Sequence, residues 1–279
     1  MTEFLEMLKV IFLGIVEGIT EWLPISSTGH MILVDEFLKL GVSEEFMEMF
    51  LVVIQLGAIC AVPILFWDKL YPFSKKKTKE ENSRILSLWG KVIVGVLPAA
   101  VLGFLLDDFF DEHFYNFITV AIALIVYGVG FILIEKLKKG KEYRVESVYD
   151  LTYKDALFIG AAQVLSLIPG TSRSGSTILG GMLGGVSRTA SAEFSFFMAI
   201  PIMLGASLLK VAKFIVGGFS ASGFEIILLL IGIAVSFIVS FFTIKFLMDC
   251  VKRHSFAPFG VYRIILGVIV IGYFLTTVL

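Results

Sequence analysis

The chain has 279 residues, of which 57% are hydrophobic and 17% are charged, and its formal net charge is −1. Soluble domains carry about 25% charged residues, so this composition excludes an ordinary soluble domain and indicates an integral membrane protein. The balanced charge argues against nucleic acid as a partner. Residues 1–6 carry acids instead of the basic start of a signal peptide, so we expect the first helix to be retained.

The first apolar segment, at about 4–40, is interrupted near its middle by the polar run from Glu17 to His30. Each half is shorter than the ~20 residues that a spanning helix needs. We therefore predict a re-entrant helix–loop–helix, whose loop must be buried in protein or line a wet cavity. Ionisable side chains are costly inside a membrane, so their presence here indicates a functional site.

Two carboxylates, Glu17 and Glu21, are four residues apart, so a helix presents both on one face. Their neighbours are apolar. Desolvation and mutual repulsion should raise the pKa of at least one of them, which suits proton transfer or cation binding. Gly14 and Gly18, also four apart, predict a face that packs closely on another helix.

His30 follows the turn Ser26-Ser27-Thr28-Gly29, within reach of both carboxylates. A histidine in this setting can act as a base, an acid or a nucleophile near neutral pH. Ser27 beside it is a candidate nucleophile, whereas Ser26 and Thr28 also suit the turn and the helix cap.

Six apolar segments are long enough to span a bilayer: 45–67, 84–106, 114–137, 188–210, 226–248 and 259–279. Three basic groups mark the cytoplasmic side: Lys75, Lys76, Lys77, Lys79 and Arg84; Lys136, Lys138, Lys139, Lys141 and Arg144; and Lys252, Arg253 and Arg263. We expect the C-terminus to lie on the outer side. We expect the same of the loop that contains Asp107, Asp108, Asp111 and Glu112. Lys210 and Lys213 are the exception, because this topology places them outside.

The second interrupted segment, at about 153–184, carries the run from Pro169 to Thr177 and predicts another re-entrant hairpin. Arg173 lies here between two serines, at the start of a helix. A guanidinium binds phosphate with two parallel hydrogen bonds, and N–H groups at a helix start form an anion cradle. The run therefore predicts a phosphate site, although it is not a Walker A motif.

The two hairpins resemble each other in sequence. Gly14-Ile15-Val16-Glu17 with Pro24…Gly29 matches Gly160-Ala161-Ala162-Gln163 with Pro169…Gly175, and Gly41-Val42-Ser43 matches Gly185-Val186-Ser187. Each serine is placed to cap a long span. Each half thus holds one hairpin and three spans, which gives opposite orientations. We predict one membrane domain, 1–279, with an inverted repeat at about 1–137 and about 153–279 and its site near the midplane.

Both motifs, Glu17-x-x-x-Glu21 with Pro24…Ser26-Ser27-Thr28-Gly29-His30, and Pro169-Gly170-x-Ser172-Arg173-Ser174-x-x-Thr177, resemble those of the bacterial undecaprenyl-diphosphate phosphatases, also called bacitracin-resistance proteins. The resemblance covers essentially the whole chain. It implies hydrolysis of undecaprenyl diphosphate to undecaprenyl phosphate and inorganic phosphate. This reaction recycles the lipid carrier for peptidoglycan synthesis, cell wall biogenesis and cell shape. The resemblance also implies a site open to the outer face of the cytoplasmic membrane.

From these residues we predict catalytic roles for His30, Glu21, Glu17 and Ser27, and substrate binding by Arg173, Ser172, Ser174, Thr177, Gly170 and Ser26. The attacking group is left open between Ser27, His30 and water. Glu17 and Glu21 could instead hold a divalent cation, Mg²⁺ or Ca²⁺; no organic cofactor is expected. The oligomeric state stays open, a homodimer included.

A transporter or lipid flippase is the alternative, because inverted repeats with broken helices are a common transporter build. The site distinguishes the two classes. A transporter needs binding groups, but it has no need of a histidine beside hydroxyls and paired acids.

Overall fold

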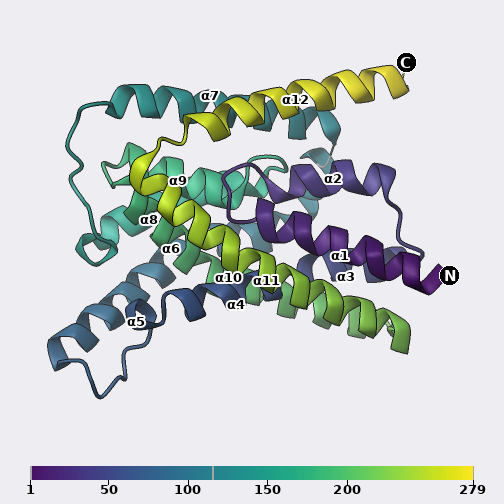
Figure 1. Ribbon diagram of the computed structural model, residues 1–279, viewed down its shortest axis with the longest axis horizontal. Coiled ribbons are helices and arrows are strands. Elements are labelled where there is room, and N and C mark those ends of the chain that lie inside the picture. Colours follow the sequence, from purple (N-terminus) through teal and green to yellow (C-terminus); the bar gives the residue numbers. More distant parts are fainter. Residues whose placement is uncertain (1, 115, 279) are drawn as a thin grey trace.

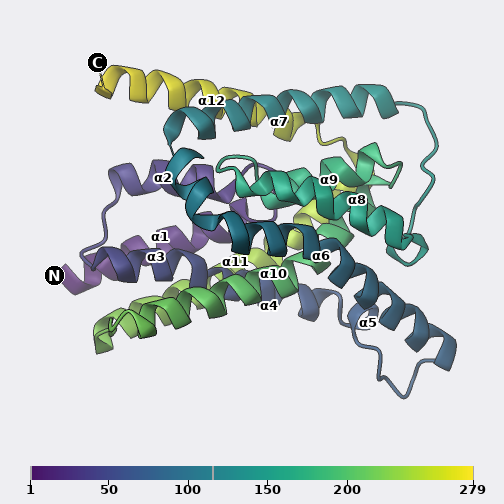
Figure 2. The same cartoon turned by 180° about the vertical axis from the view of Figure 1, so that it is seen from behind.

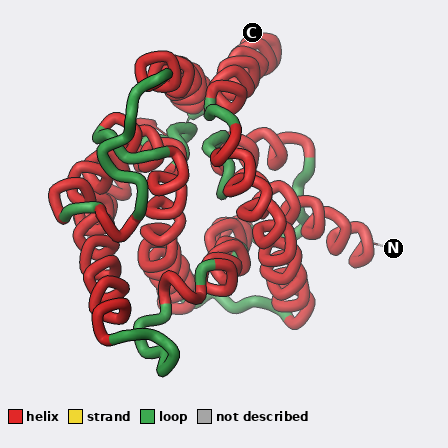
Figure 3. Tube along the Cα trace, turned by 60° about the vertical axis from the view of Figure 1, so that its left-hand side comes forward, coloured by secondary structure: helices red, strands yellow, loops and turns green. Residues whose placement is uncertain are grey.

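The computed structural model describes residues 2–114 and 116–278, and these form helices and loops without a strand (Figure 3). The all-α prediction is confirmed. Six stretches are long and apolar enough to cross a membrane: Glu44–Leu65, Lys79–Leu106, Phe117–Lys138, Arg188–Val216, Gly223–Arg253 and Ala257–Thr276. They match the six predicted spans, and the protein is a multi-pass helical membrane protein.

The first half begins with α1 (Thr2–Thr20) and α2 (Ser27–Phe37), which form a helix–loop–helix. The first span is two helices that meet at Ile54, followed by a short helix and two long ones. These are α3 (Glu44–Val53), α4 (Gln55–Leu65), α5 (Trp67–Leu70), α6 (Lys79–Phe114) and α7 (Phe117–Lys138).

The second half repeats this order. A 3₁₀ turn, η1 (Val148–Asp150), precedes a second helix–loop–helix built from α8 (Tyr153–Val164), η2 (Leu165–Leu167) and α9 (Arg173–Leu183). Three long helices follow: α10 (Arg188–Val216), α11 (Gly223–Arg253) and α12 (Ala257–Val278).

The helix starts follow local sequence rules. Ser43 and Ser187 cap α3 and α10 as predicted, because their hydroxyls accept from Phe46 N and Ala190 N, each at 3.2 Å. Asn116 caps α7 by accepting from Thr119 N at 2.9 Å. The acidic segment predicted to be an outward-facing loop is a correction: α6 continues through it to Phe114, since no Gly or Pro lies between Asp107 and Asn116. The side chains of Asp107, Asp108 and Asp111 lie outside the described part.

The two helix–loop–helix units enter the molecule from opposite ends, and their loops meet near its middle (Figures 1 and 2). α1 packs on α11, as the glycine pair predicts. A Cβ on Gly14 would lie 3.1 Å from the carbonyl oxygen of Gly232, and one on Gly18 would lie 2.9 Å from that of Ser236. α8 packs on α6 in the same manner, since a Cβ on Gly160 would lie 2.2 Å from the Gly95 oxygen.

Both described ends of the chain lie at one end of the molecule, and the basic loops after α5, α7 and α11 lie at the other (Figures 1 and 2). At the end that holds the termini, Lys210 Nζ pairs with Glu48 Oε2 at 2.8 Å, so this exceptional lysine has an acidic partner. Arg263 departs from the prediction of a cytoplasmic loop: it is fully buried inside α12.

Candidate active site

The loop of each helix–loop–helix unit, called a hairpin below, ends in a serine whose backbone φ is positive. Ser26 has φ 74° and Ser172 has φ 72°, and they are the two non-glycine residues with positive φ among those described. Their hydroxyls cap the helices that follow, accepting from Gly29 N at 3.2 Å and Gly175 N at 3.1 Å. Such a conformation costs about 1–3 kcal/mol and persists where the surroundings fix it, often at functional sites.

Glu21 and Arg173 join the two hairpins. Arg173 Nη2 lies 2.9 Å from Glu21 Oε1, and the side chains are only 12% and 8% exposed. Arg173 Nη1 donates to the carbonyl oxygen of Ser195 on α10 at 2.9 Å, and its Cζ lies 5.8 Å from the centre of the Trp22 ring. The Nε of Arg173 is buried and has no hydrogen-bond partner in the described structure, so this donor remains available.

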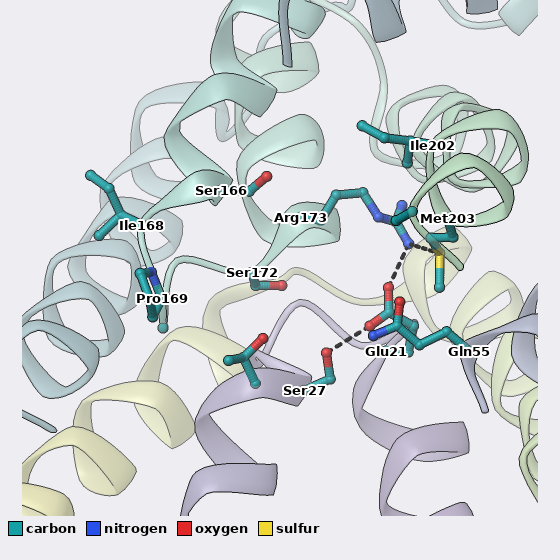
Figure 4. A pocket seen from close by; sticks show the side chains of 13 residues that line it. Glu21, Ser27, Gln55, Ser166, Ile168, Pro169, Ser172, Arg173, Ile202 and Met203 are labelled. Atoms are coloured by element: carbon teal, nitrogen blue, oxygen red, sulfur yellow. Dashed lines mark hydrogen bonds and ion pairs between the residues drawn. The ribbon is translucent and has the colours of Figure 1, made fainter. Parts of the chain in front are cut away.

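Ser27 completes this arrangement from the start of α2. Its hydroxyl donates to Glu21 Oε2 at 2.6 Å, so the carboxylate lies between a hydroxyl and a guanidinium (Figure 4). A carboxylate held in this way can accept the proton of the serine hydroxyl, while the arginine keeps it oriented.

Other residues of the second hairpin that are predicted to bind the substrate make hydrogen bonds within the protein. Ser174 donates to the carbonyl oxygen of Glu21 at 3.2 Å, and Thr177 donates to Ser195 Oγ at 2.7 Å. Both are buried, and neither they nor Ser26 line the cavity described below. Gly170 does line it, and glycine is required there because φ is 88° and a Cβ would lie 2.6 Å from the carbonyl oxygen of Val120.

Both ring nitrogens of His30 have partners other than Ser27. Its Nδ1 lies 2.7 Å from the carbonyl oxygen of Ser26, and its Nε2 lies 2.7 Å from the hydroxyl of Tyr262 on α12. The ring is therefore held between the first loop and the last helix. The expected position of His30 beside the Ser27 hydroxyl differs from the structure, where Ser27 bonds to Glu21.

Glu17 is 1% exposed and lies one turn before Glu21 on α1. Its Oε1 has no hydrogen-bond partner in the described structure. It does not line the cavity. A buried carboxyl in this state is a candidate for holding a proton, because the charged form is strongly disfavoured without a partner.

Arg263 on α12 fixes both loops from behind. Its guanidinium donates to the carbonyl oxygens of Pro24 at 3.1 Å, Gly170 at 2.8 Å and Thr171 at 3.0 Å. The Tyr127 ring centre lies 5.5 Å from its Cζ. Among described residues no carboxylate pairs with it, so a full positive charge stays close to the site.

The cavity where the hairpins meet has a volume of about 180 Å³. Polar side chains lie between two apolar pairs, Ile168 with Pro169 and Ile202 with Met203 (Figure 4). Its lining residues are Glu21, Ser27, Thr28, Gln55, Ser166, Ile168, Pro169, Gly170, Ser172, Arg173, Ile202, Met203 and Ala206. α2 and α9 both begin beside it, and helix starts favour anions. The arrangement can bind an anion, stabilise its charge and supply a nucleophile.

The two carboxylates predicted to hold a divalent cation, Glu17 and Glu21, have different surroundings. Both oxygens of Glu21 bond to other side chains, and Glu17 lies outside the cavity lining. No three His, Cys, Asp or Glu side chains of the described residues lie together as a metal-binding group.

Sequence reasoning missed three residues at this site: Arg263, Ser195 and Gln55. Arg263 carried a usable signal, since a cation within the predicted span 259–279 is as unusual as one in the hairpins. Ser195 and Gln55 carried none, because small or neutral polar residues within apolar helices are common.

Fold and site together define a polytopic helical membrane protein with a polar cavity between two helix–loop–helix units. The family described as "Bacitracin resistance protein BacA" matches residues 10–269, and the chain belongs to this family.

Relatives named "Undecaprenyl-diphosphatase" match over nearly the full length of both chains. That of Enterococcus faecalis is 58% identical over 98% of this chain and 99% of its own. That of Acetivibrio thermocellus is 60% identical over 97% and 98%. That of Streptococcus mutans is 54% identical over 99% of each.

Proposed function

We propose that this protein hydrolyses undecaprenyl diphosphate to undecaprenyl phosphate and inorganic phosphate. The observation that carries the proposal is Glu21, which accepts from the Ser27 hydroxyl at 2.6 Å and from Arg173 at 2.9 Å at the edge of a cavity. The full-length relatives bear the name of this enzyme. The role in recycling the lipid carrier, and hence in bacitracin resistance, follows from the same reaction.

The diphosphate lies in the cavity between the starts of α2 and α9. Arg173 has an unused Nε donor, and Ser172 and the N–H groups of Gly170 and the α9 start are beside it. These groups stabilise the charge that spreads over the transferring phosphoryl oxygens, which is the main contribution a protein makes to phosphoryl transfer.

Ser27 Oγ attacks the terminal phosphorus, and Glu21 takes the hydroxyl proton. The bond from this phosphorus to the bridging oxygen breaks, and Glu21 gives its proton to that oxygen, which releases undecaprenyl phosphate, leaves a phosphoserine and makes Glu21 a carboxylate again. A water molecule then attacks the phosphoserine. Glu21 takes a proton from this water and passes it to Ser27 Oγ as the phosphorus–Oγ bond breaks, which releases inorganic phosphate and restores Ser27. His30 acts as a positioning residue through Ser26, and Glu17 exchanges a proton with Glu21 across one helical turn.

A divalent cation, Mg²⁺ or Ca²⁺, would bind through the oxygens of the diphosphate, with Glu21 as the carboxylate that lines the cavity. It would screen the negative charge of the substrate. Every step above is carried by residues of the chain.

The two helix–loop–helix units are re-entrant hairpins of an inverted repeat, 1–137 and 153–279, in the cytoplasmic membrane. Support comes from their entry at opposite ends and from the equivalent contacts of Gly14 on α11 and Gly160 on α6. The basic loops lie at the end opposite the termini (Figure 1), which assigns the end with the termini to the outer side, and an opening of the cavity toward that side is part of the proposal.

The experiment measures phosphate release from undecaprenyl diphosphate by the purified protein, alongside Ser27→Ala and Glu21→Gln. Glu45→Gln, on the exposed start of α3, is the control. We expect release to fall at least about a thousandfold in both site variants and to be unchanged in the control. Substantial release by Ser27→Ala would exclude the serine nucleophile. Lipid binding without release by wild type would favour the transporter.

A further inference from the structure

The cavity is large enough for a diphosphate group but not for the lipid attached to it. Its volume of about 180 Å³ is below the roughly 300–1,000 Å³ of pockets that enclose a drug-sized ligand. The chain of a polyprenyl substrate must therefore leave the cavity through an opening, and that opening must lead to hydrocarbon.

Apolar side chains line the cavity at two places. Ile168 and Pro169 lie at one side, and Ile202 and Met203 of α10 lie at the other, with polar side chains between them (Figure 4). Met203 lies beside the polar centre, since its Sδ is 3.7 Å from Arg173 Nη2. The α10 side therefore brings apolar surface next to the groups that would hold the charged end of a substrate.

Ala206 marks where the cavity opens. It lines the cavity and is also exposed on the surface of α10, within a spanning segment. Gly205 beside it is exposed as well, and a Cβ built on it would meet no atom within 4 Å. Two small residues thus leave open space at the rim.

A continuous strip connects this rim with the lipid-facing surface. Ile202, Gly205, Ala206 and Leu209 follow the spacing i, i+3, i+4 and i+7, which places them along one face of α10. We call these four residues the α10 strip. Leu204 and Leu208 flank it, with 46% and 61% of their surface exposed, so its surroundings are apolar.

We propose that the α10 strip is the exit path of the polyprenyl chain, and that Gly205 and Ala206 set the space available to its first isoprene units. This inference rests on the proposed function for the identity of the substrate. The strip begins at Ile202, which lines the cavity, and runs along α10 toward the end that holds the chain termini. The chain therefore reaches the same leaflet as the cavity opening.

Bulky substitutions test the path. Gly205→Phe and Ala206→Phe fill the strip, and Gly272→Phe is the matched control, since Gly272 is also an exposed helical glycine of a spanning segment with no atom within 4 Å of its Cβ position. Each variant is assayed with undecaprenyl diphosphate and with isopentenyl diphosphate, which has one isoprene unit.

We expect the strip variants to raise KM for undecaprenyl diphosphate about tenfold or more, with kcat/KM for isopentenyl diphosphate changed less than about threefold. The control should match wild type with both. Equal losses with both substrates would instead indicate an entrance for water or exit for phosphate, and would overturn the proposal. So would unchanged kinetics with the long substrate.

A binding measurement separates the path from the reaction. Undecaprenyl phosphate with a photoreactive diazirine in its first isoprene unit is bound to wild type, photolysed and mapped by mass spectrometry. Capture on residues 202–209 is expected, and capture confined to other helices would overturn the exit path. If wild type releases no phosphate while the label is on α10, the proposed function fails and the path stands.

Discussion

Arg263 on the last helix donates from Nη2 to the carbonyl oxygen of Gly170 in the second hairpin loop, at 2.8 Å. The same guanidinium donates from Nη1 to the carbonyl oxygen of Pro24 in the first loop, at 3.1 Å. One buried side chain therefore fixes the distance between two loops that are far apart in sequence. The ion pair between Glu21 and Arg173 depends on that distance, because the two residues belong to different helix–loop–helix units.

Arg263→Lys should keep the charge but lose the bridge, because an ammonium on a flexible stem cannot reproduce the planar fork. A hydrogen bond from a charged donor contributes about 1.5–3 kcal/mol, so losing one or more of these bonds should lower the stability by at least that amount. We expect a lower Tm in detergent and a drop of kcat/KM by at least about tenfold. Arg253→Lys, on the exposed end of α11, is the control. A variant with normal stability and turnover would refute the bridging role.

Ser195 positions Arg173 from α10. Its carbonyl and hydroxyl oxygens accept from Arg173 Nη1 at 2.9 and 3.3 Å, and its hydroxyl also accepts from Thr177. Hydrogen bonds to charged groups contribute about 1.5–3 kcal/mol, so Ser195→Ala should lower kcat/KM by about tenfold. Ser207→Ala removes another buried serine of α10, bonded to the Val52 carbonyl instead, and should leave kcat/KM unchanged. Equal kinetics of the two variants would argue against the positioning role.

The sequence predicts the spans and the two broken segments because hydropathy and local turn residues determine them. The caps at Ser43 and Ser187 and the close packing at Gly14 follow from equally local rules. The sequence groups Arg263 with Lys252 and Arg253 as a mark of the cytoplasmic side, because basic residues are typical of cytoplasmic loops. The burial of Arg263 depends instead on tertiary contacts with the loops of both helix–loop–helix units. Ser195 could not be found, since its role arises only when α10 packs beside α9. The sequence does not predict the helical turns at 107–114, because a run of acidic residues is typical of a loop. No Gly or Pro in this segment breaks the helix, however, and α6 continues through it.

His30 and Tyr262 should act as one unit. If His30 positions the first loop through the 2.7 Å contact with the Tyr262 hydroxyl, then His30→Ala and Tyr262→Phe should lower kcat by similar factors. The double variant should lose little more, because residues of one network are not additive. The measurement is a double-mutant cycle on kcat. A much larger loss in His30→Ala than in Tyr262→Phe would instead indicate direct proton transfer by the histidine.

Asp155 makes the start of α8 sensitive to acid. Burial alone would raise the pKa of this carboxyl, but hydrogen bonds from Arg144 and Thr152 lower it below the ordinary value of 3.8. Its contribution to stability is therefore present above about pH 3.8 and is lost as the pH falls through the lower pKa of the folded state. Arg144 also donates to the carbonyl oxygen of Gly184 at 3.0 Å, so protonation of Asp155 should loosen residues 144–155 and the end of α9 together.

Hydrogen–deuterium exchange over 144–155 checks this expectation. After correction for the intrinsic effect of pH, exchange should rise below about pH 3.8 in wild type and be high at all pH values in Asp155→Asn. Asp249→Asn, at an exposed ion pair with Lys252 on α11, should follow wild type. Protection of 144–155 that persists in acid in wild type would show that the Arg144 contact does not control this end of the hairpin.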